Sequence, residues 1–288
     1  MQKTINYKTK TKLIKELLNE DYVSELKKRS TFSKLTFKKR EFADIYFHSG
    51  ALDKEAQENI ENAQKVIVNS LTSQHQLLKE FDTPREKIEV IYPAVSVEYQ
   101  KPKEAKKSVC EKLEIDPEKK IVFFTAQNLK TSGVVEFINI IMYLTLKNVV
   151  GVILGDKKQI YNLKFKLSKF DVDDKLILLD DYENIDDLFL ASDVFLLPTK
   201  NKNFASSVLR AMYCKCAVFT TVNNAAKEVI DVFSMMETSD DRSMQFKLTA
   251  LLQNKDDLKL IKKQNRKIAK EYTLDKQLEK VKDIIKNI

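Results

Sequence analysis

Histidine, the residue that most often performs acid–base catalysis at neutral pH, occurs only twice in this chain, as His48 and His75. His48 stands in the sequence Tyr-Phe-His-Ser-Gly, and a loop there could carry its imidazole to a cleft. We therefore treat His48 as the candidate catalytic residue. The alternative is that His48 packs against its aromatic neighbours or is solvated. His75 falls on a polar predicted helix, where solvation is the simpler interpretation.

Phosphate binding in this chain cannot rely on a glycine-rich loop. The four glycines, at positions 50, 133, 151 and 155, form neither a G-x-G-x-x-G motif nor a Walker A loop. A phosphate would have to be held by helix N-termini and by cationic side chains. Ser206 and Ser207 open a predicted helix at about 205–214, so their backbone N–H groups would favour an anion.

Metal binding and disulfide bonding are both disfavoured by the cysteine content. Cys110, Cys214 and Cys216 leave an odd thiol and have no histidine partner nearby, so we expect no metal and no cofactor. The first residues are polar, and no apolar run reaches the roughly 20 residues that span a bilayer. These features predict a cytoplasmic protein, either free or peripheral at the inner face of the membrane.

The net charge of +8, from 50 Lys and Arg against 42 Asp and Glu, is compatible with an anionic partner. Residues 32–47 alternate aromatic and cationic side chains and could face anionic lipid headgroups or a nucleic acid. The alternative is a helix that buries its aromatic side chains and solvates its charges. Because no nucleic-acid reader motif occurs, no nucleic-acid partner is expected.

The elements that would position these residues alternate between strand and helix from residue 119 onward. Continuous apolar runs predict strands buried on both faces, at 120–125, 150–155, 175–179, 193–197, 217–220 and 232–236. Helices are predicted between them, at about 133–146, 157–169, 184–191, 205–214 and 224–230. This alternation indicates an α/β fold with a doubly wound, Rossmann-like parallel sheet over residues 101–272.

The remaining residues predict a smaller, truncated and largely helical domain over residues 1–100. Helices are expected at 10–29, 53–64 and 72–81, with short strands at 66–68 and 88–91. Residues 273–288 predict an amphipathic helix that packs back toward this domain. Its apolar stripe is formed by Leu274, Leu278, Val281, Ile285 and Ile288.

Seven segments, in compatible order and spacing, resemble the family 4 retaining glycosyltransferases of the GT-B fold. They are 63–70 (AQKVIVNS), 85–102, 121–138, 150–156 (VGVILGD), 184–199, 203–221 and 223–230 (NNAAKEVI). The resemblance implies that residues 101–272 bind a nucleotide diphosphate sugar and that residues 1–100 form the acceptor side. The donor-binding residues it implies are Gln127, Lys130, Gly133, Lys202, Phe204, Ser206, Ser207, Arg210 and Glu228.

Several family positions carry different residues in this chain. When aligned on Ala211-Met212, the family's two glutamates, which meet donor sugar and ribose hydroxyls, fall on Lys202 and Arg210. Lysine and arginine only donate hydrogen bonds, whereas a carboxylate accepts them. The family's phosphate-facing cations fall on Gln127 and Ser132, and its glycines on Ala205, Asn224 and Ala225. Of the acidic positions, Glu228 is retained.

Two functions remain open at this point. The first is transfer of a hexose from a nucleotide diphosphate sugar to a glycan or lipid-linked acceptor, in the synthesis of a cell-surface polysaccharide or lipopolysaccharide. The second is a catalytically inactive subunit that partners an active glycosyltransferase. Lys130, Lys202 and Arg210 could restore positive charge near the phosphates, or Lys202 and Arg210 could be solvated cations on a relic loop.

Overall fold

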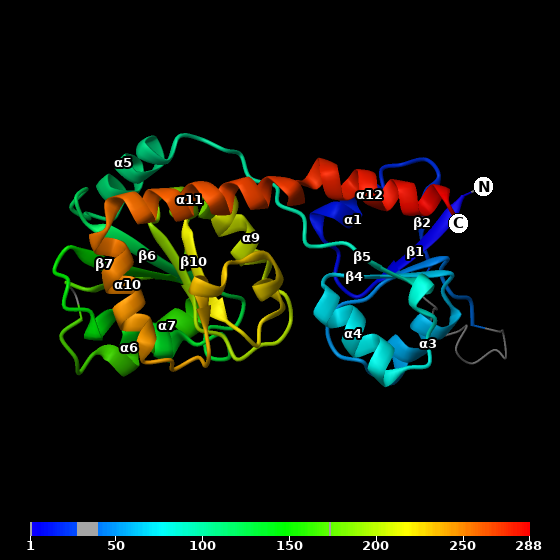
Figure 1. Ribbon diagram of the computed structural model, residues 1–288, viewed down its shortest axis with the longest axis horizontal. Helices are drawn as coiled ribbons and strands as arrows, with labels where there is room; N and C mark the ends of the chain where they lie inside the picture. Colours follow the sequence, from blue (N-terminus) through cyan, green and yellow to red (C-terminus); the bar gives the residue numbers. More distant parts are fainter. Residues whose placement is uncertain (1, 28–39, 173) are drawn as a thin grey trace. The chain divides into compact units, whose positions relative to one another are not determined.

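The computed structural model describes residues 2–27, 40–172 and 174–288 (Figure 1). The chain forms two compact units. Unit 1 comprises Met1–Ala94 together with Tyr272–Ile288, and unit 2 comprises Val95–Glu271. Half of the mixed aromatic and cationic segment at residues 32–47, namely 32–39, lies outside the described residues. No helix among the described residues combines the length and the apolar character required to span a bilayer.

Unit 2 is built on a parallel sheet with the strand order β11-β10-β9-β6-β7-β8. The strands are β6 (Lys120–Thr125), β7 (Val149–Leu154), β8 (Leu176–Leu179), β9 (Val194–Leu197), β10 (Ala217–Thr221) and β11 (Met235–Met236). This is the doubly wound Rossmann order, with its switch point between β6 and β9. The predicted α/β class is thus confirmed. Strands β6, β9 and β10 are almost wholly buried, which explains why their apolar runs are uninterrupted.

Helices cover both faces of this sheet (Figure 1). They are α5 (Pro102–Lys112), α6 (Val134–Tyr143), α7 (Lys157–Leu167), α8 (Ile185–Ala191), α9 (Ser206–Tyr213), α10 (Ser243–Gln253) and α11 (Lys255–Ala269). The helix predicted at 224–230 is instead a 3-10 segment, Ala225–Val229, and a second such turn, Val232–Ser234, precedes β11. Phenylalanines from β6, β9 and α8 meet in the core, where the rings of Phe123 and Phe189 are 4.9 Å apart.

Unit 1 contains a five-stranded parallel sheet with the order β2-β1-β3-β4-β5. The strands are β1 (Lys3–Tyr7), β2 (Val23–Glu25), β3 (Ile45–Phe47), β4 (Lys65–Val68) and β5 (Ile88–Val90). The prediction that the first hundred residues are largely helical is therefore wrong. In β1 only Ile5 is fully buried, so this strand has no apolar run that would distinguish it from a polar segment.

The helix predicted at 10–29 is also too long, because α1 covers only Lys12–Leu17. Thr11 caps its first turn through Oγ1, which accepts from the N–H of Ile14 at 3.3 Å. The chain then turns and enters β2, which pairs with β1. The other helices of this unit, among its described residues, are α3 (Lys54–Asn62), α4 (Leu71–Glu80) and α12 (Leu274–Lys286). A 3-10 turn lies at Arg85–Lys87, and another, Lys270–Tyr272, leads from unit 2 into unit 1.

Helix α12, which comes from the end of the chain, completes the core of unit 1. Val281 and Ile285 are buried in one cluster with Ile5, Leu17 and Ile45. The predicted apolar stripe is the face that α12 turns toward this cluster, because Leu274, Leu278 and Ile288 also pack there. Burial of these side chains stabilises unit 1 by roughly 1.5–3 kcal/mol for each fully buried aliphatic side chain.

Candidate functional site

The carboxyl ends of β6, β9 and β10 carry the loops in which the predicted donor-binding residues lie. Ligands on doubly wound sheets bind at this edge, beside the switch point. Residues 126–133 follow β6, residues 198–205 follow β9, and residues 222–228 follow β10. The contacts between these loops decide which of the predicted residues come together.

Gly133 joins the first two loops by a close backbone approach. It has φ +88°, and a Cβ at this position would lie 1.9 Å from the carbonyl oxygen of Pro198. The backbone N–H of Lys200 also bonds to the carbonyl of Thr131, and Lys200 Nζ lies 2.8 Å from Glu136 Oε1 on α6. Glycine is therefore required at position 133 both for its conformation and for the space it leaves.

Gln159 on α7 fixes the loop after β6. Its side chain accepts from the N–H of Leu129 at 2.8 Å and donates to the carbonyl of Gln127 at 3.0 Å. The same amide group bonds to Asp156, the N-cap of α7. Leu129 fills the space above Gly155, where a Cβ would clash with its side chain. The backbone of Gln127 is thus fixed, while its side chain is exposed.

Asn224 joins the second loop to the third and is buried. Its amide nitrogen donates to the carbonyls of Asn201 at 2.9 Å and Asn203 at 2.7 Å. Its Oδ1 accepts from the backbone N–H groups of Ala205 at 3.2 Å and Ala226 at 3.0 Å. One side chain therefore satisfies two backbone carbonyls and two backbone N–H groups. The resemblance identifies Asn224 only as the position of a family glycine, and nothing in the sequence predicted this role.

The N-terminus of α9 opens directly after these bonds. Ala205 is the N-cap and makes no side-chain capping bond. Within the part of the chain that the structure describes, the backbone N–H groups of Ser206 and Ser207 have no hydrogen-bond acceptor. Phe204 is buried and anchors the turn. Uncapped N–H groups combined with the partial positive charge of the helix dipole favour an anion at this position.

The three loops bring together most of the predicted donor-binding residues. Lys130 and Lys202 are exposed on the loops after β6 and β9, and Glu228 is half-buried in the segment after β10. The N–H of Ala225 bonds to the carbonyl of Lys202 at 3.0 Å, which holds these last two loops in register.

Arg210 has a different environment from the other predicted residues. Its Nε lies 2.5 Å from Asp186 Oδ1 in the first turn of α8, and its guanidinium lies 5.7 Å from the ring centroid of Phe189. The side chain of Asp186 is only 11% exposed. Arg210 is therefore not a solvated cation. Asp186, which is 24 residues away in the chain, was not among the residues predicted from the sequence.

Unit 1 has its own switch point, between β1 and β3, since its strand order is the flavodoxin-like one. His48 directly follows β3, and Lys8 directly follows β1. Lys8 Nζ lies 2.8 Å from Asp53 Oδ2, and Asp53 caps α3 through Oδ1, which accepts from the N–H of Ala56 at 2.9 Å. The bond to Lys8 lowers the pKa of the Asp53 carboxyl.

His48 is buried beside this ion pair, with a relative exposure of 7%. Its Nδ1 has no hydrogen-bond partner among the described residues, and its ring lies 5.9 Å from that of Tyr46. Burial lowers the pKa of His48, and the charge of Lys8 adds to this effect. Burial also raises the pKa of Tyr46 to about 12. The imidazole is accordingly neutral near pH 7, and its Nδ1 is buried without a hydrogen-bond partner among the described residues.

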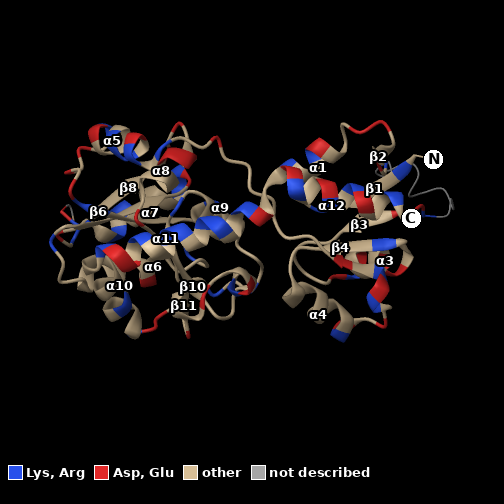
Figure 2. Ribbon diagram, turned by 45° about the horizontal axis from the view of Figure 1, so that its top comes forward, with Lys and Arg blue, Asp and Glu red and all other residues tan. Residues whose placement is uncertain are grey.

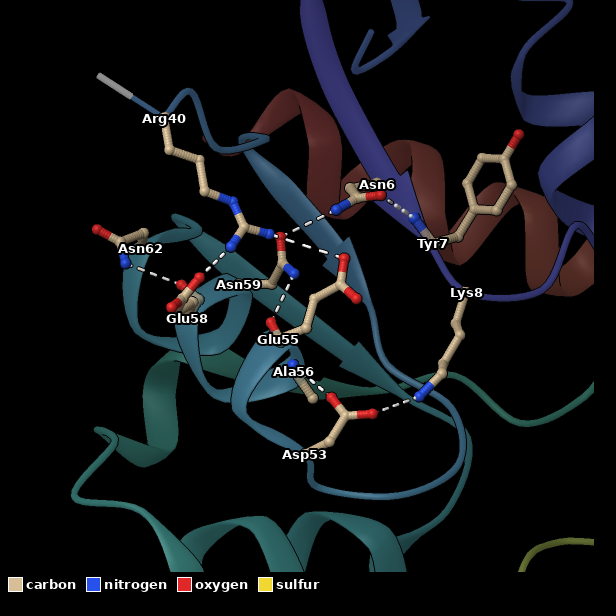
Figure 3. A network of polar contacts seen from close by, with 10 residues as sticks. All are labelled: Asn6, Tyr7, Lys8, Arg40, Asp53, Glu55, Ala56, Glu58, Asn59 and Asn62. Carbon is tan, nitrogen blue, oxygen red and sulfur yellow. Dashed lines mark hydrogen bonds and ion pairs between the residues drawn. The ribbon is translucent and has the colours of Figure 1, made fainter. Parts of the chain in front are cut away.

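A second polar network lies beside the end of β1 (Figure 3). Arg40 pairs with Glu58 and lies 3.7 Å from Glu55, while Asn6 Nδ2 donates to Asn59 Oδ1 at 2.9 Å. These side chains line a cavity of about 890 Å³ that also includes Lys8 and Lys27. The cavity walls are polar and of mixed charge, which suits a ligand with many hydroxyl groups.

A family model described as glycosyl transferases group 1 matches residues 106–268. No curated protein matches the chain at a significant level. A glycosyltransferase from Rickettsia africae ESF-5 is similar in structure, with a TM-score of 0.74 and 17% sequence identity over 96% of this chain and 79% of that one.

Two further solved structures are similar at comparable levels. Anabaena HepE in complex with UDP and glucose has a TM-score of 0.70 and 15% identity, covering 85% of this chain and 71% of that one. WaaG, a glycosyltransferase involved in lipopolysaccharide biosynthesis, has a TM-score of 0.68 and 16% identity, covering 97% of this chain and 85% of that one. At these identities the similarity establishes the GT-B fold.

Proposed function

Because the chain belongs to the glycosyl transferases group 1 family, we propose that it transfers a hexose, with retention, from a nucleotide diphosphate sugar to a glycan or lipid-linked acceptor. The acceptor class is that of a cell-surface polysaccharide or lipopolysaccharide. HepE, a structural neighbour, has been solved with UDP-glucose, and WaaG functions in lipopolysaccharide biosynthesis.

The observation that carries the proposal is the N-terminus of α9 at the carboxyl edge of the unit 2 sheet. The N–H groups of Ser206 and Ser207 are available to an anion, and Asn224 holds the preceding turn in place. A diphosphate bound there would gain positive potential from the helix dipole, and Lys130 and Lys202 stand on the adjoining loops. Stabilising the departing diphosphate in this way is the main catalytic contribution we propose.

His48 remains our candidate catalytic residue in unit 1. Its imidazole is neutral and its Nδ1 has no hydrogen-bond partner among the described residues, but this atom is buried, so contact with an acceptor hydroxyl requires the ring to become exposed. The nearby Lys8–Asp53 pair holds the loop after β1 against the first turn of α3. Acceptor binding in the polar cavity lined by Asn6, Lys8 and Arg40 is part of the same proposal.

Calorimetric titration with UDP, GDP and their sugars tests the donor site. We expect saturable binding of one nucleotide, and we expect Ser206→Pro, which removes one backbone N–H at the first position of α9, to weaken it by about tenfold. Proline is compatible with the first turn of a helix, so the variant should remain folded. A flat titration at millimolar nucleotide would contradict the proposal.

A catalytically inactive partner subunit is the second candidate, and the Arg210–Asp186 pair favours it. A guanidinium held by a buried carboxylate cannot accept hydrogen bonds from ribose hydroxyls. In this case purification from native cells should return a second glycosyltransferase bound to the chain. Recovery of the chain as a clean monomer, together with measurable turnover, would exclude this function.

A further inference from the structure

Helix α7 of unit 2 exposes aromatic side chains on the side that faces away from the core. Ile160 and Leu163 are buried, and α7 packs through them against the sheet. Tyr161 and Phe165 are 70% and 76% exposed, and Phe170, just beyond the helix, is 66% exposed. Exposed aromatic side chains so close together on one element are unusual on a surface that faces only water.

The exposed aromatic residues of α7 are spaced so that they lie along one side of the helix. Successive residues rotate by about 100° around a helix, so Tyr161 and Phe165, four apart, lie on one stripe. This stripe is nearly opposite the buried side that Ile160 and Leu163 define. Lys158, three residues before Tyr161, falls on the same stripe, and Lys169, four residues after Phe165, continues its line beyond the helix.

Between Asp156, the N-cap of α7, and Asp171, the charge on this segment is of one sign. Residues 157–170 contain five lysines and no acidic residue, and all five lysines are exposed: Lys157, Lys158, Lys164, Lys166 and Lys169. None of the five forms an ion pair with a carboxylate among the described residues. Lysines and arginines are spread over many elements of both units (Figure 2), so charge alone does not distinguish α7.

Helix α11 provides the comparison. It also carries several exposed lysines, but Asp256 and Asp257 occupy its first turn and no aromatic side chain is exposed on it. Only α7 combines unpaired lysines with exposed aromatic rings on one stripe, among the helices that the structure describes. That combination is typical of helices that lie in the interface of an anionic membrane.

We propose that the outward face of α7, formed by Lys158, Tyr161, Phe165, Lys169 and Phe170, binds the surface of an anionic lipid bilayer. The rings enter the headgroup region while the lysines contact lipid phosphates. A second copy of this face is disfavoured, because Lys158 and Lys169 of one copy would meet the same lysines of the other. Single-stranded nucleic acid is bound in grooves, whereas this face is a single convex helix. The inference does not depend on glycosyltransferase activity.

The chain contains no tryptophan, so a single substitution gives a unique fluorescent probe. Phe165→Trp is expected to show a blue-shifted emission on phosphatidylcholine vesicles that contain phosphatidylglycerol, and none on phosphatidylcholine alone. Phe246→Trp on α10 is the matched control, because Phe246 is also 76% exposed but lies outside this face. An unchanged Phe165→Trp spectrum on anionic vesicles, or an equal shift for both variants, would overturn the proposal.

Vesicle co-sedimentation of the full chain tests whether binding depends on the lysines of α7 in particular or only on the total positive charge. K158Q/K164Q/K169Q is expected to weaken binding on the order of a hundredfold. K255Q/K259Q/K263Q on α11 removes the same charge and should have a much smaller effect. Phe165→Ser should weaken binding by about tenfold. Equal losses for the two lysine variants, binding to oligonucleotides but not to vesicles, or a vesicle-independent shift from self-association would each refute a lipid-binding face.

Discussion

Arg210 on α9 and Asp186 on α8 form a close ion pair, with Nε 2.5 Å from Oδ1, in which the carboxylate side chain is 11% exposed and the arginine side chain 35%. The resemblance to family 4 glycosyltransferases places a glutamate at position 210, and this chain has a cation there that is already paired. Arg210 thus stabilises the packing of α9 against α8.

Reversing the charge at this position should therefore affect stability before it affects ligand binding. Arg210→Glu would place two carboxylates together, and we expect unfolding to become easier by about 2 kcal/mol, a value reduced for the exposure of Arg210. R210E/D186N should recover most of this loss because the repulsion is removed. Urea denaturation of the four members of the cycle measures the coupling. Additive effects would show that the pair contributes nothing.

Asn224 should be essential to the order of the loop after β9. Asn224→Ala leaves the carbonyls of Asn201 and Asn203 and the N–H of Ala205 without a partner. We expect a loss of about 2–4 kcal/mol in unfolding free energy. Asn223→Ala, at an exposed neighbouring position, is the control and should be nearly neutral. Proteolysis at residues 201–205 should increase in the first variant and not in the second.

Gly133 and Gly50 allow the cost of backbone strain to be separated from the cost of steric overlap. Both have a positive φ, +88° and +90°, but a Cβ at Gly50 would meet nothing within 4 Å, whereas one at Gly133 would overlap the carbonyl of Pro198. Gly50→Ala should cost about 1–2 kcal/mol from backbone strain alone. Gly133→Ala should cost clearly more, because β9 or α6 must move. Equal losses in thermal unfolding would contradict the close approach.

His48 should make stability fall as the pH is lowered. Its folded pKa lies below the ordinary value of 6.5, chiefly because of burial, so the unfolded chain binds the proton more tightly. The contribution of neutral His48 to the free energy of unfolding is therefore fully present above about pH 6.5 and is lost as the pH falls through the folded pKa. Urea unfolding in a His75→Gln background isolates this effect, because His48 is then the only histidine. If the unfolding free energy of H48Q/H75Q still falls with pH to the same extent, the effect belongs to carboxylates and not to His48.

The accuracy of the sequence analysis followed the degree of burial. In unit 2 the strands are covered on both faces, so their apolar runs alone located β6 to β10 to within about a residue at most ends. In unit 1, β1 buries only Ile5 completely and β2 buries only Val23, so neither strand is distinguishable from a polar segment. β1 is a strand because it pairs with β3, and β2 is a strand because it pairs with β1.

The donor-binding site, like the fold, was predictable only in part. The loops and the start of α9 followed from strand order and from the resemblance, because the carboxyl ends of parallel strands share an edge. The partners of Asn224 and Arg210 could not be predicted, because each bond joins elements about twenty residues apart whose approach depends on helix packing. The buried environment of His48 likewise depends on Lys8 and Asp53, which arrive from other elements.

The position of α12 in the core of unit 1 has a consequence during synthesis on the ribosome. The strands of this unit emerge before unit 2, yet Val281 and Ile285, which complete their hydrophobic cluster, are translated after it. Unit 2 is contiguous and can fold as soon as it leaves the exit tunnel. The nascent sheet β2-β1-β3-β4-β5 must therefore wait with one apolar face uncovered, a period in which holding by a chaperone would protect it.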